Sequence, residues 1–430
     1  MRTMDLNDEG IVFVAEQDGS LVGSITARKI RQIIRDGGYV GDAVSKFANP
    51  ATITGKVNMA DDELLGLNPN GSAMFLPVLD ADNKLTEVVE LPGKKAPKRI
   101  MVTGAAGYIG SILARKLLDL GYEVVIFDDL IYGNTAIADL EHPSLTVVKG
   151  DLKHVEDITA ALDGVDSVVH LAGIVGDPAC ALHPLTTLEQ NVHSTATLAS
   201  ICKYHQINRF VFASSCSVYG TGDEILTEES DLNPVSLYAR DKINSENVLK
   251  NLKDENFAPT FMRMGTIFGL SPRPRFDLAV NVLTAFAVRT GKFTIFGGDQ
   301  WRPFVHVEDA ATSYIKALQA PIENVHGEVF NVGSNGQNWK IEDVGYKLKE
   351  LMPHTEMVIS GEDTDKRDYR VNFDKITNVL GFEITKTVED GIREFEKFLI
   401  ENEDVDFRDA YYSNLKGFKE ALQKKEVIFS

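Results

Sequence analysis

Cysteine is scarce in this sequence. Only Cys180, Cys202 and Cys216 occur among 430 residues, with neither CxxC nor metal-ligand spacing. A disulfide framework is therefore not expected, and we expect no metal site. A reducing compartment, the cytoplasm, is the expected location.

Basic residues are also in deficit. Lysine and arginine number 44 against 63 acidic residues, a formal net charge of −19. This charge argues against nucleic acid or an anionic membrane as a partner.

Long apolar runs are lacking too, since no stretch approaches the ~18 residues of a membrane-spanning helix. What is present is an ordinary globular composition, 43% hydrophobic and 25% charged, and a length sufficient for more than one domain.

Apolar, strand-like runs alternate with helical segments after residue 98. Runs such as "EVVIFDDL", "SVVHLAG" and "RFVFASS" are rich in β-branched and aromatic residues, and "HVEDITAALDG" is one of the helical stretches between them. Strands that are apolar on both faces predict a doubly wound parallel sheet of the Rossmann type, an α/β fold. The basic, Pro- and Gly-containing segment "LPGKKAPKR" (residues 91–99) is predicted to be a linker. We therefore expect domains at residues 1–94 and 95–430.

The N-terminal domain contains two similar pieces. Each has a strand, an acidic turn around Asp18 or Asp82, and a second strand. This pattern resembles a CBS (cystathionine-β-synthase-type) module, an α+β unit, over residues 9–92. Members that bind adenosine nucleotides usually place an Asp three residues after a Thr or Ser, where this chain has Lys29 after Thr26. The resemblance therefore favours a docking or oligomerisation domain over a regulatory nucleotide sensor.

Three glycines follow the first strand of the larger domain. In "TGAAGYIG", Gly104, Gly107 and Gly110 stand between a strand and a helix. Such a turn lets backbone approach a pyrophosphate, and the helix N-terminus offers free N–H groups to it. Asp128 ends the next strand, 18 residues beyond Gly110, near the ~20 typical of the acid that accepts the ribose hydroxyls. Because its carboxylate would repel the 2′-phosphate of NADP, we predict NAD as the cofactor.

Later motifs agree with a dinucleotide site. "GDL" (residues 150–152), "HLAG" (170–173) and "LEQNV" follow in order. Together with the glycine spacing they resemble the extended short-chain dehydrogenase/reductase family, in its NAD-dependent nucleotide-sugar epimerase/dehydratase group, over residues 98–400. The resemblance implies further cofactor contacts at Tyr108, Ile109, Asp129, Asp151, Leu152, Leu171, Ala172, Gly173 and Asn191. It also implies a nucleoside diphosphate sugar as partner and a smaller substrate lobe formed mainly by residues 265–300 and 355–430. We also expect a homodimer.

Tyr238 and Lys242 lie four residues apart in "SLYARDK". On a helix both side chains share one face. Tyrosine, with a pKa near ~10, is a poor base at neutral pH, and a nearby ammonium lowers that pKa. The pair therefore suits the removal of a proton from an alcohol. The resemblance adds that Lys242 bonds the nicotinamide ribose and that Ser215, in "SSCSVYG", holds the sugar hydroxyl.

Cys216 and Ser217 follow this serine. In sugar-nucleotide 4,6-dehydratases the two corresponding residues are typically Asp and Glu, the acid and base for eliminating water, so elimination lacks its carboxylate pair here. Two interpretations of Cys216 stay open. It is an acid/base that exchanges a proton beside a ketone, as in GDP-fucose-synthase-like enzymes, or a small residue at a crowded strand end.

Further motifs resemble the substrate side of the family. In "GKFTIFGGDQWRPFVHVEDAA" (residues 291–311), the resemblance implies that Phe296 flanks the base of the nucleotide. It also implies that Arg302 meets the diphosphate with a charge-assisted fork. A second cation is expected at Arg367 in "DKRDYRVNFDKI", with Arg370 as the alternative.

Two loops complete the predicted substrate site. "LSPRPRFDLAVN" (residues 270–281) is predicted to form a lid, with Asn281 close to the phosphates. In "GIVGDPACA", Cys180 is expected to face the sugar.

Three functions are therefore considered. The first hypothesis is a nucleotide-sugar epimerase that acts at C4 through a 4-keto intermediate, in surface polysaccharide sugar biosynthesis. The alternative is a nucleotide-sugar 4-dehydrogenase or a ketosugar C3/C5 epimerase that uses a cysteine. The third is a non-catalytic NAD-binding regulator, against which the intact Ser215, Tyr238 and Lys242 count.

Overall fold

The structure is a computed structural model that describes residues 10–39, 41–60, 63–64, 67, 75–90, 98–361 and 367–429. The predicted linker at residues 91–99 therefore lies almost wholly outside the described residues. No helix among the described residues is long and apolar enough to cross a bilayer.

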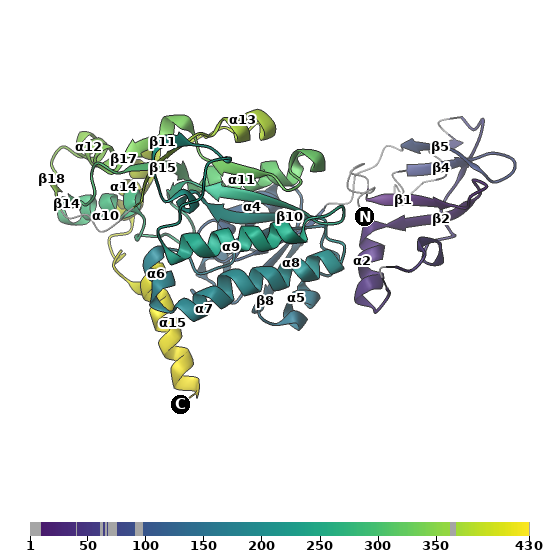
Figure 1. The fold of residues 1–430 in the computed structure, drawn as a ribbon, viewed down its shortest axis with the longest axis horizontal. Coiled ribbons are helices and arrows are strands. Elements are labelled where there is room, and N and C mark those ends of the chain that lie inside the picture. The colour runs from purple at the N-terminus through teal and green to yellow at the C-terminus, as the bar shows by residue number, and fades with distance from the viewer. Residues whose placement is uncertain are drawn as a thin grey trace.

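A sheet of seven strands, parallel at every pairing described, is the centre of the larger domain (Figure 1). From edge to edge the strands are β16 (Val329–Val332), β12 (Ala258–Met264), β10 (Arg209–Ser215), β9 (Ser167–His170), β6 (Arg99–Thr103), β7 (Glu123–Asp128) and β8 (Leu145–Lys149). The winding reverses between β6 and β9, and such a reversal opens a crevice at the C-terminal ends of the strands. The predicted Rossmann-type α/β fold is confirmed.

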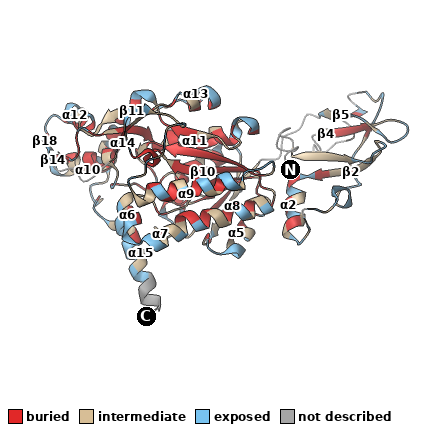
Figure 2. Ribbon diagram, in the orientation of Figure 1, coloured by how far each residue is buried: buried red, intermediate tan, exposed pale blue. Residues whose placement is uncertain are grey.

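Helices cover both faces of this sheet (Figure 1). On one face lie α4 (Gly110–Asp119) and α11 (Val307–Gln319), and on the other α5 (Val155–Ala161), α8 (Ser194–Tyr204) and α9 (Leu237–Leu252). Alternate side chains of a strand point to opposite faces, so Ile126 joins the core under α4 while its neighbour Phe127 joins the core under α8. Each such burial stabilises the fold by about 1.5–3 kcal/mol. The strands other than the edge strand β8 are accordingly buried on both sides (Figure 2).

A smaller lobe packs beside the C-terminal ends of the strands. Its strands are β13 (Thr266–Phe268), β15 (Trp301–His306), β17 (Asn338–Lys340), β14 (Lys292–Ile295), β18 (Glu356–Ile359), β11 (Thr221–Leu226) and β19 (Asp368–Val371). Its helices are α10 (Ala279–Thr290), α12 (Ile341–Leu351) and α14 (Val388–Glu401), while α13 (Asp374–Leu380) packs on β16. The lobe thus also draws on residues 301–306 and 338–351, because β15 completes a sheet with β13 and β17, which α12 follows directly.

The N-terminal residues form a separate small unit (Figure 1). Its elements are β1 (Ile11–Ala15), β2 (Leu21–Thr26), α2 (Ala27–Arg35), the short helix η1 (Val44–Lys46), β3 (Gly55–Lys56), β4 (Phe75–Leu79) and β5 (Leu85–Glu90). The two hairpins meet tip to tip: the Leu21 N–H donates to the Asn83 carbonyl (3.2 Å), and the Leu85 N–H donates to the Gly19 carbonyl (3.0 Å). These are equivalent positions of the two similar pieces, so the repeat in the sequence is also a repeat in space.

Arginines of α2 hold this unit against the larger domain. Arg31 pairs with Asp166, Arg35 pairs with Asp163, and Arg28 lies 3.9 Å from Asp166. Both aspartates precede β9, so the unit docks at the N-terminal ends of the strands. It therefore lies at the end of the sheet opposite the crevice.

Candidate active site

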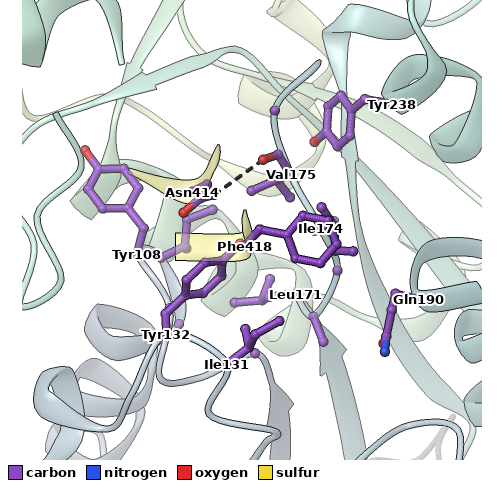
Figure 3. Close-up of a pocket in the computed structure, with 18 of the residues that line it drawn as sticks. Tyr108, Ile131, Tyr132, Leu171, Ile174, Val175, Gln190, Tyr238, Asn414 and Phe418 are labelled. Atoms are coloured by element: carbon purple, nitrogen blue, oxygen red, sulfur yellow. Dashed lines mark hydrogen bonds between the residues drawn. The ribbon is translucent and has the colours of Figure 1, made fainter. Parts of the chain in front are cut away.

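A cavity of about 400 Å³ lies at the crevice (Figure 3). Residues after β6, β7, β9 and β10, the first turns of α4 and α9, and the C-terminal helix α15 (Asn414–Phe429) supply its walls. The predicted cofactor residues that line it are Gly104, Gly107, Tyr108, Ile109, Gly110, Asp128, Asp129, Asp151, Leu152, Leu171, Ala172, Gly173, Tyr238 and Lys242. The tertiary structure thus brings together motifs that are far apart in the chain.

The glycine turn leaves no room for side chains. Gly104 has φ +71°, and a Cβ there would lie 2.7 Å from the backbone nitrogen of Ala172. A Cβ on Gly110, the first residue of α4, would lie 2.4 Å from the Gly104 carbonyl oxygen. Among the described residues no side-chain capping bond is formed at Ile109, the N-cap of α4, so the N-terminus of this helix is open to an anion. This backbone cradle fits the diphosphate of a dinucleotide such as NAD.

Asp128 is half-buried at the end of β7 and faces the same cavity. Its carboxylate accepts hydrogen bonds from the backbone N–H groups of Ala106 (3.0 Å) and Leu130 (2.8 Å). Burial raises the pKa of Asp128 to about 6, although both hydrogen bonds act to lower it. Each carboxylate oxygen keeps acceptor capacity for a ribose hydroxyl, as NAD requires.

Asn191, also predicted to contact the cofactor, does not line the cavity. It lies in the π-helical turn η3 (Glu189–His193), where its side chain accepts from the Ile174 N–H (2.8 Å) and donates to the Ile174 carbonyl (3.0 Å). Asn191 therefore supports the loop that follows β9. Asn191 thus supports, from outside the cavity, the loop whose residues Leu171 and Gly173 line it.

Ser215 and Tyr238 meet across the cavity wall. Ser215 ends β10, and Tyr238 stands in the first turn of α9, which Ser236 caps by accepting from the Ala239 N–H (3.2 Å). Burial raises the pKa of Tyr238 above its usual range, with the charges of Cys180 and Asp177 adding to the shift. The hydrogen bond with Ser215 opposes it.

Lys242 does not depress the pKa of Tyr238 in the way the spacing predicts. Its ammonium donates to the Ala213 carbonyl (2.6 Å) and lies 5.7 Å from the centre of the Tyr238 ring. Burial lowers the pKa of Lys242 to about 8. The prediction of a lowered tyrosine pKa is corrected for the protein without ligands, because desolvation outweighs the effect of the cation.

Neither predicted cysteine reaches the cavity. Cys216 is fully buried, donates to the Arg263 carbonyl (3.1 Å) and has its pKa raised by burial. Cys180 is also fully buried, donates to the Ile174 carbonyl (3.2 Å), and burial raises its pKa to about 12. A thiol must contact the sugar to exchange a proton or bind it, so these positions count against both predicted roles and favour Cys216 as a small residue at a crowded strand end.

The two predicted substrate arginines differ in position. Arg367 lines the cavity, with its Nε 3.6 Å from Asp177. Arg302 is buried outside it and donates to the Trp301 carbonyl (2.8 Å), the Gln300 side chain (2.9 Å) and the Arg367 carbonyl. Arg302 therefore supports the strand segment that carries Arg367, and this arrangement counts against direct contact of Arg302 with the diphosphate.

Two further predicted substrate residues, Asn281 and Phe296, also lie outside the cavity. Asn281 is fully buried and accepts from the Gly269 N–H (3.1 Å) while donating to the Tyr108 hydroxyl (3.2 Å) and the Arg275 carbonyl (2.8 Å). Its hydrogen-bonding groups are thus used within the protein. Phe296 does not line the cavity and is 53% exposed on the surface of the lobe.

Several lining residues were not predicted individually. Arg273 and Arg275 lie in the segment predicted as a lid, and its cluster of basic residues was the signal for them. Tyr132 follows β7, and Asn414 and Phe418 come from α15 (Figure 3). No local pattern predicts that α15 packs here, because its contacts with Ile174 and Cys180 join segments far apart in the sequence.

Comparisons with known proteins agree with this geometry. Residues 100–333 match the NAD dependent epimerase/dehydratase family. The protein named uncharacterized UDP-glucose epimerase YtcB of Bacillus subtilis is 33% identical over 249 residues, 55% of this chain and 76% of the relative. UDP-glucose 4-epimerase of the same species is 27% identical over 293 residues, 62% of this chain and 84% of the relative.

A solved structure shows the same fold. UDP-glucuronic acid 4-epimerase from Bacillus cereus, in complex with UDP-glucuronic acid and NAD, has a TM-score of 0.63 and 26% sequence identity. The match covers 70% of this chain and 99% of that protein. Nearly all of the solved chain is thus matched, while this chain has residues beyond it.

Proposed function

Because this chain belongs to the NAD dependent epimerase/dehydratase family, we propose that it is an NAD-dependent nucleotide-sugar epimerase that acts at C4 through a 4-keto intermediate. Relatives named as UDP-glucose 4-epimerases support this assignment. The observation that carries it is the placement of Ser215, Tyr238 and Lys242 on the cavity that also contains the glycine turn.

The chain's own residues supply the acid and base. Tyr238 removes the proton from O4 of the sugar, and Ser215 holds the same hydroxyl in place. The hydrogen bond with Ser215 and the charge of Arg275 favour the phenolate against the effect of burial. Returning the proton to O4 of the reduced sugar completes the cycle, so no proton is consumed.

The cofactor site follows from the same walls. The turn at Gly104, Gly107 and Gly110 would hold the diphosphate of NAD, and Asp128 would accept the adenosine ribose hydroxyls. Lys242 donates one of its three N–H groups to Ala213, which leaves donors for the nicotinamide ribose. When bound, NAD would supply reversible hydride transfer at C4 of the sugar.

Alternative reactions lack their residues. The residues that follow Ser215 are Cys216 and Ser217, so an elimination has no carboxylate pair at this place. Within the described residues no cysteine lines the cavity, which counts against a thiol-dependent C3/C5 epimerase. Net oxidation at C4 is the remaining competitor, because it uses the same serine and tyrosine.

The N-terminal unit is proposed to be a CBS-like docking module, here residues 1–94. Its tip-to-tip hairpins and the ion pairs of α2 with Asp163 and Asp166 support this. Lys29 donates to Gln32 (3.1 Å) at the position where nucleotide-binding members carry Asp. We further propose that the protein is a homodimer, which light scattering would test. We also propose that it works in the cytoplasm and serves surface polysaccharide synthesis, and loss of surface polysaccharide after deletion of the gene would test the pathway.

A panel of UDP-, GDP-, CDP- and dTDP-sugars tests the proposed reaction. The expected result is an isomeric sugar nucleotide formed without consumption of added NAD. Stoichiometric formation of NADH would indicate a 4-dehydrogenase instead. A product lighter by one water would indicate a dehydratase, and failure with every sugar would contradict the proposal.

A further inference from the structure

The segment between β13 and α10 is fixed to the N-terminus of α4. The Ser271 hydroxyl donates to the Tyr108 carbonyl (2.6 Å) and lies 3.3 Å from the hydroxyl of Ser111. The Tyr108 hydroxyl in turn donates to the Gly269 carbonyl. These bonds hold the segment across the end of a ten-residue helix whose N-terminus no side chain caps. The residues that follow Ser271 are therefore close to the glycine turn.

Arg273 is buried in this segment and lines the cavity with Gly107 and Asp128. Its side chain is 2% exposed. One terminal nitrogen donates to the Asn414 side chain (2.8 Å), the other approaches the Tyr411 carbonyl (3.5 Å), and the guanidinium lies 4.0 Å from the ring centre of Tyr132. The third nitrogen, Nε, is buried without a hydrogen-bond partner in the part of the chain that the structure describes.

No described carboxylate lies within ion-pair distance of Arg273. The nearby Asp277 is occupied, because it accepts two hydrogen bonds from Arg275 (2.9 and 3.1 Å) and one from the Asn414 N–H (2.9 Å). Arg275 adds a second positive charge beside Arg273. A buried cation without an anionic partner is costly, so the site is arranged for an anion.

We propose that Arg273 binds the diphosphate of the dinucleotide from the side opposite the glycine turn. The inference rests on the cofactor site of the proposed function. Two independent features point to the same anion: the uncapped N-terminus of α4 and the unpartnered Nε of Arg273. A guanidinium presents several N–H donors in a fixed fork, which matches the oxygens of a diphosphate. Asn414 and Tyr132 hold the fork, and α15 thereby becomes part of the cofactor site.

Titration of the full-length chain with NAD, ADP, adenosine and UDP tests this. For the variants Arg273→Met and Arg273→Lys, the dissociation constants of NAD and ADP should rise, by about 10- to 100-fold for Arg273→Met. The smaller rise is expected for Arg273→Lys, which keeps the charge and loses the fork. Adenosine, which has no phosphate, should bind all three proteins equally, and so should UDP.

Arg289→Met is the matched control. Arg289 also has a buried Nε that no described residue accepts from, and it donates to the Asn402 carbonyl (2.6 Å), but it does not line the cavity. This variant should bind NAD and ADP like the wild type. If Arg273→Met does not fold, as circular dichroism would show, Arg273→Lys carries the test.

Three outcomes would overturn the inference. Unchanged binding of ADP in Arg273→Lys and Arg273→Met would remove Arg273 from the site. An equal loss for adenosine would show that Arg273 only supports Tyr132 and α15. A loss for UDP alone would assign the arginine to the diphosphate of the substrate. Because ADP binding needs no sugar, the inference stands or falls separately from the epimerase reaction.

Discussion

Lys242 follows Tyr238 by four residues on α9, yet its ammonium donates to the Ala213 carbonyl and lies 5.7 Å from the centre of the Tyr238 ring. The tyrosine instead has its hydrogen bond with Ser215. In the protein without ligands, the base is therefore held neutral by burial. We infer that its ionisation depends on the groups that substrate and cofactor bring to the cavity.

Replacing Tyr238 with Phe should abolish epimerisation and leave NAD binding intact. The ring and its packing against Ile174 and Phe418 are kept, while the oxygen that carries the proton is lost. The loss of such a base typically lowers the rate by about 100-fold or more. Turnover of the identified sugar nucleotide and NAD content of the purified variant are the two measurements. Near-normal turnover would remove Tyr238 from the mechanism.

Asp128 should make the protein select NAD over NADP. Its half-buried carboxylate faces the cavity beside the glycine turn, where a 2′-phosphate would meet a like charge. Calorimetric titration with both cofactors is the measurement, and NAD should bind far more tightly. Asp128→Asn should narrow the difference, because it removes the repulsion while keeping a similar shape. Equal affinities in the wild type would contradict the assignment.

NAD affinity should fall as the pH is lowered through about 6, the pKa of Asp128 in the protein without cofactor. The ionised carboxylate accepts hydrogen bonds from the ribose hydroxyls more strongly than the protonated acid, which has lost acceptor capacity. Above this pKa the group is ionised and the affinity should level off. The control is Asp128→Asn. This variant should bind NAD more weakly, and its NAD affinity should not change as the pH passes through about 6. A wild-type dissociation constant that stays flat across this pH range would count against the role.

Replacing Cys216 with Ser should retain most activity. The thiol lies outside the cavity and donates to the Arg263 carbonyl, a bond that a hydroxyl also forms. Turnover in heavy water should leave C3 and C5 of the product free of deuterium, since a 4-epimerase returns hydride and exchanges no carbon-bound proton there. Deuterium at either carbon in the wild type, lost in the serine variant, would restore the acid/base role of Cys216.

Arg31 should matter more than Arg35 for docking of the N-terminal unit. The Arg31–Asp166 pair is largely buried, with side chains 5% and 23% exposed, whereas those of Arg35 and Asp163 are 29% and 65% exposed. Removing one partner of a buried pair costs about 3–5 kcal/mol, and an exposed pair contributes about 0–1 kcal/mol. Hydrogen exchange of α2 should therefore rise strongly in Arg31→Met and little in Arg35→Met. Equal exchange in the two variants would argue against docking through this contact.

Local sequence determined the fold class, and it determined the glycine turn and the position of Asp128 in the proposed cofactor site. Strands apolar on both faces require a layer of helices on each side, so the parallel sheet followed from the pattern alone. Gly104 and Gly110 stand where any Cβ would collide with backbone, and the spacing to Asp128 is that of one strand–helix–strand unit. These features depend on neighbouring residues, which is why the sequence is sufficient to predict them.

Which side chains face the cavity was decided only by tertiary packing. Cys216 and Tyr238 belong to adjoining motifs. Cys216 is nevertheless enclosed in the hydrophobic core, whereas Tyr238 lines the cavity. Arg302 has the residue type of a diphosphate ligand, but backbone carbonyls and Gln300 take up its donors. Arg273 and Asn414 are 141 residues apart and meet only because the first turns of α15 line the crevice. A side chain's direction and its free hydrogen-bonding capacity depend on segments distant in the chain, and no local pattern contains that information.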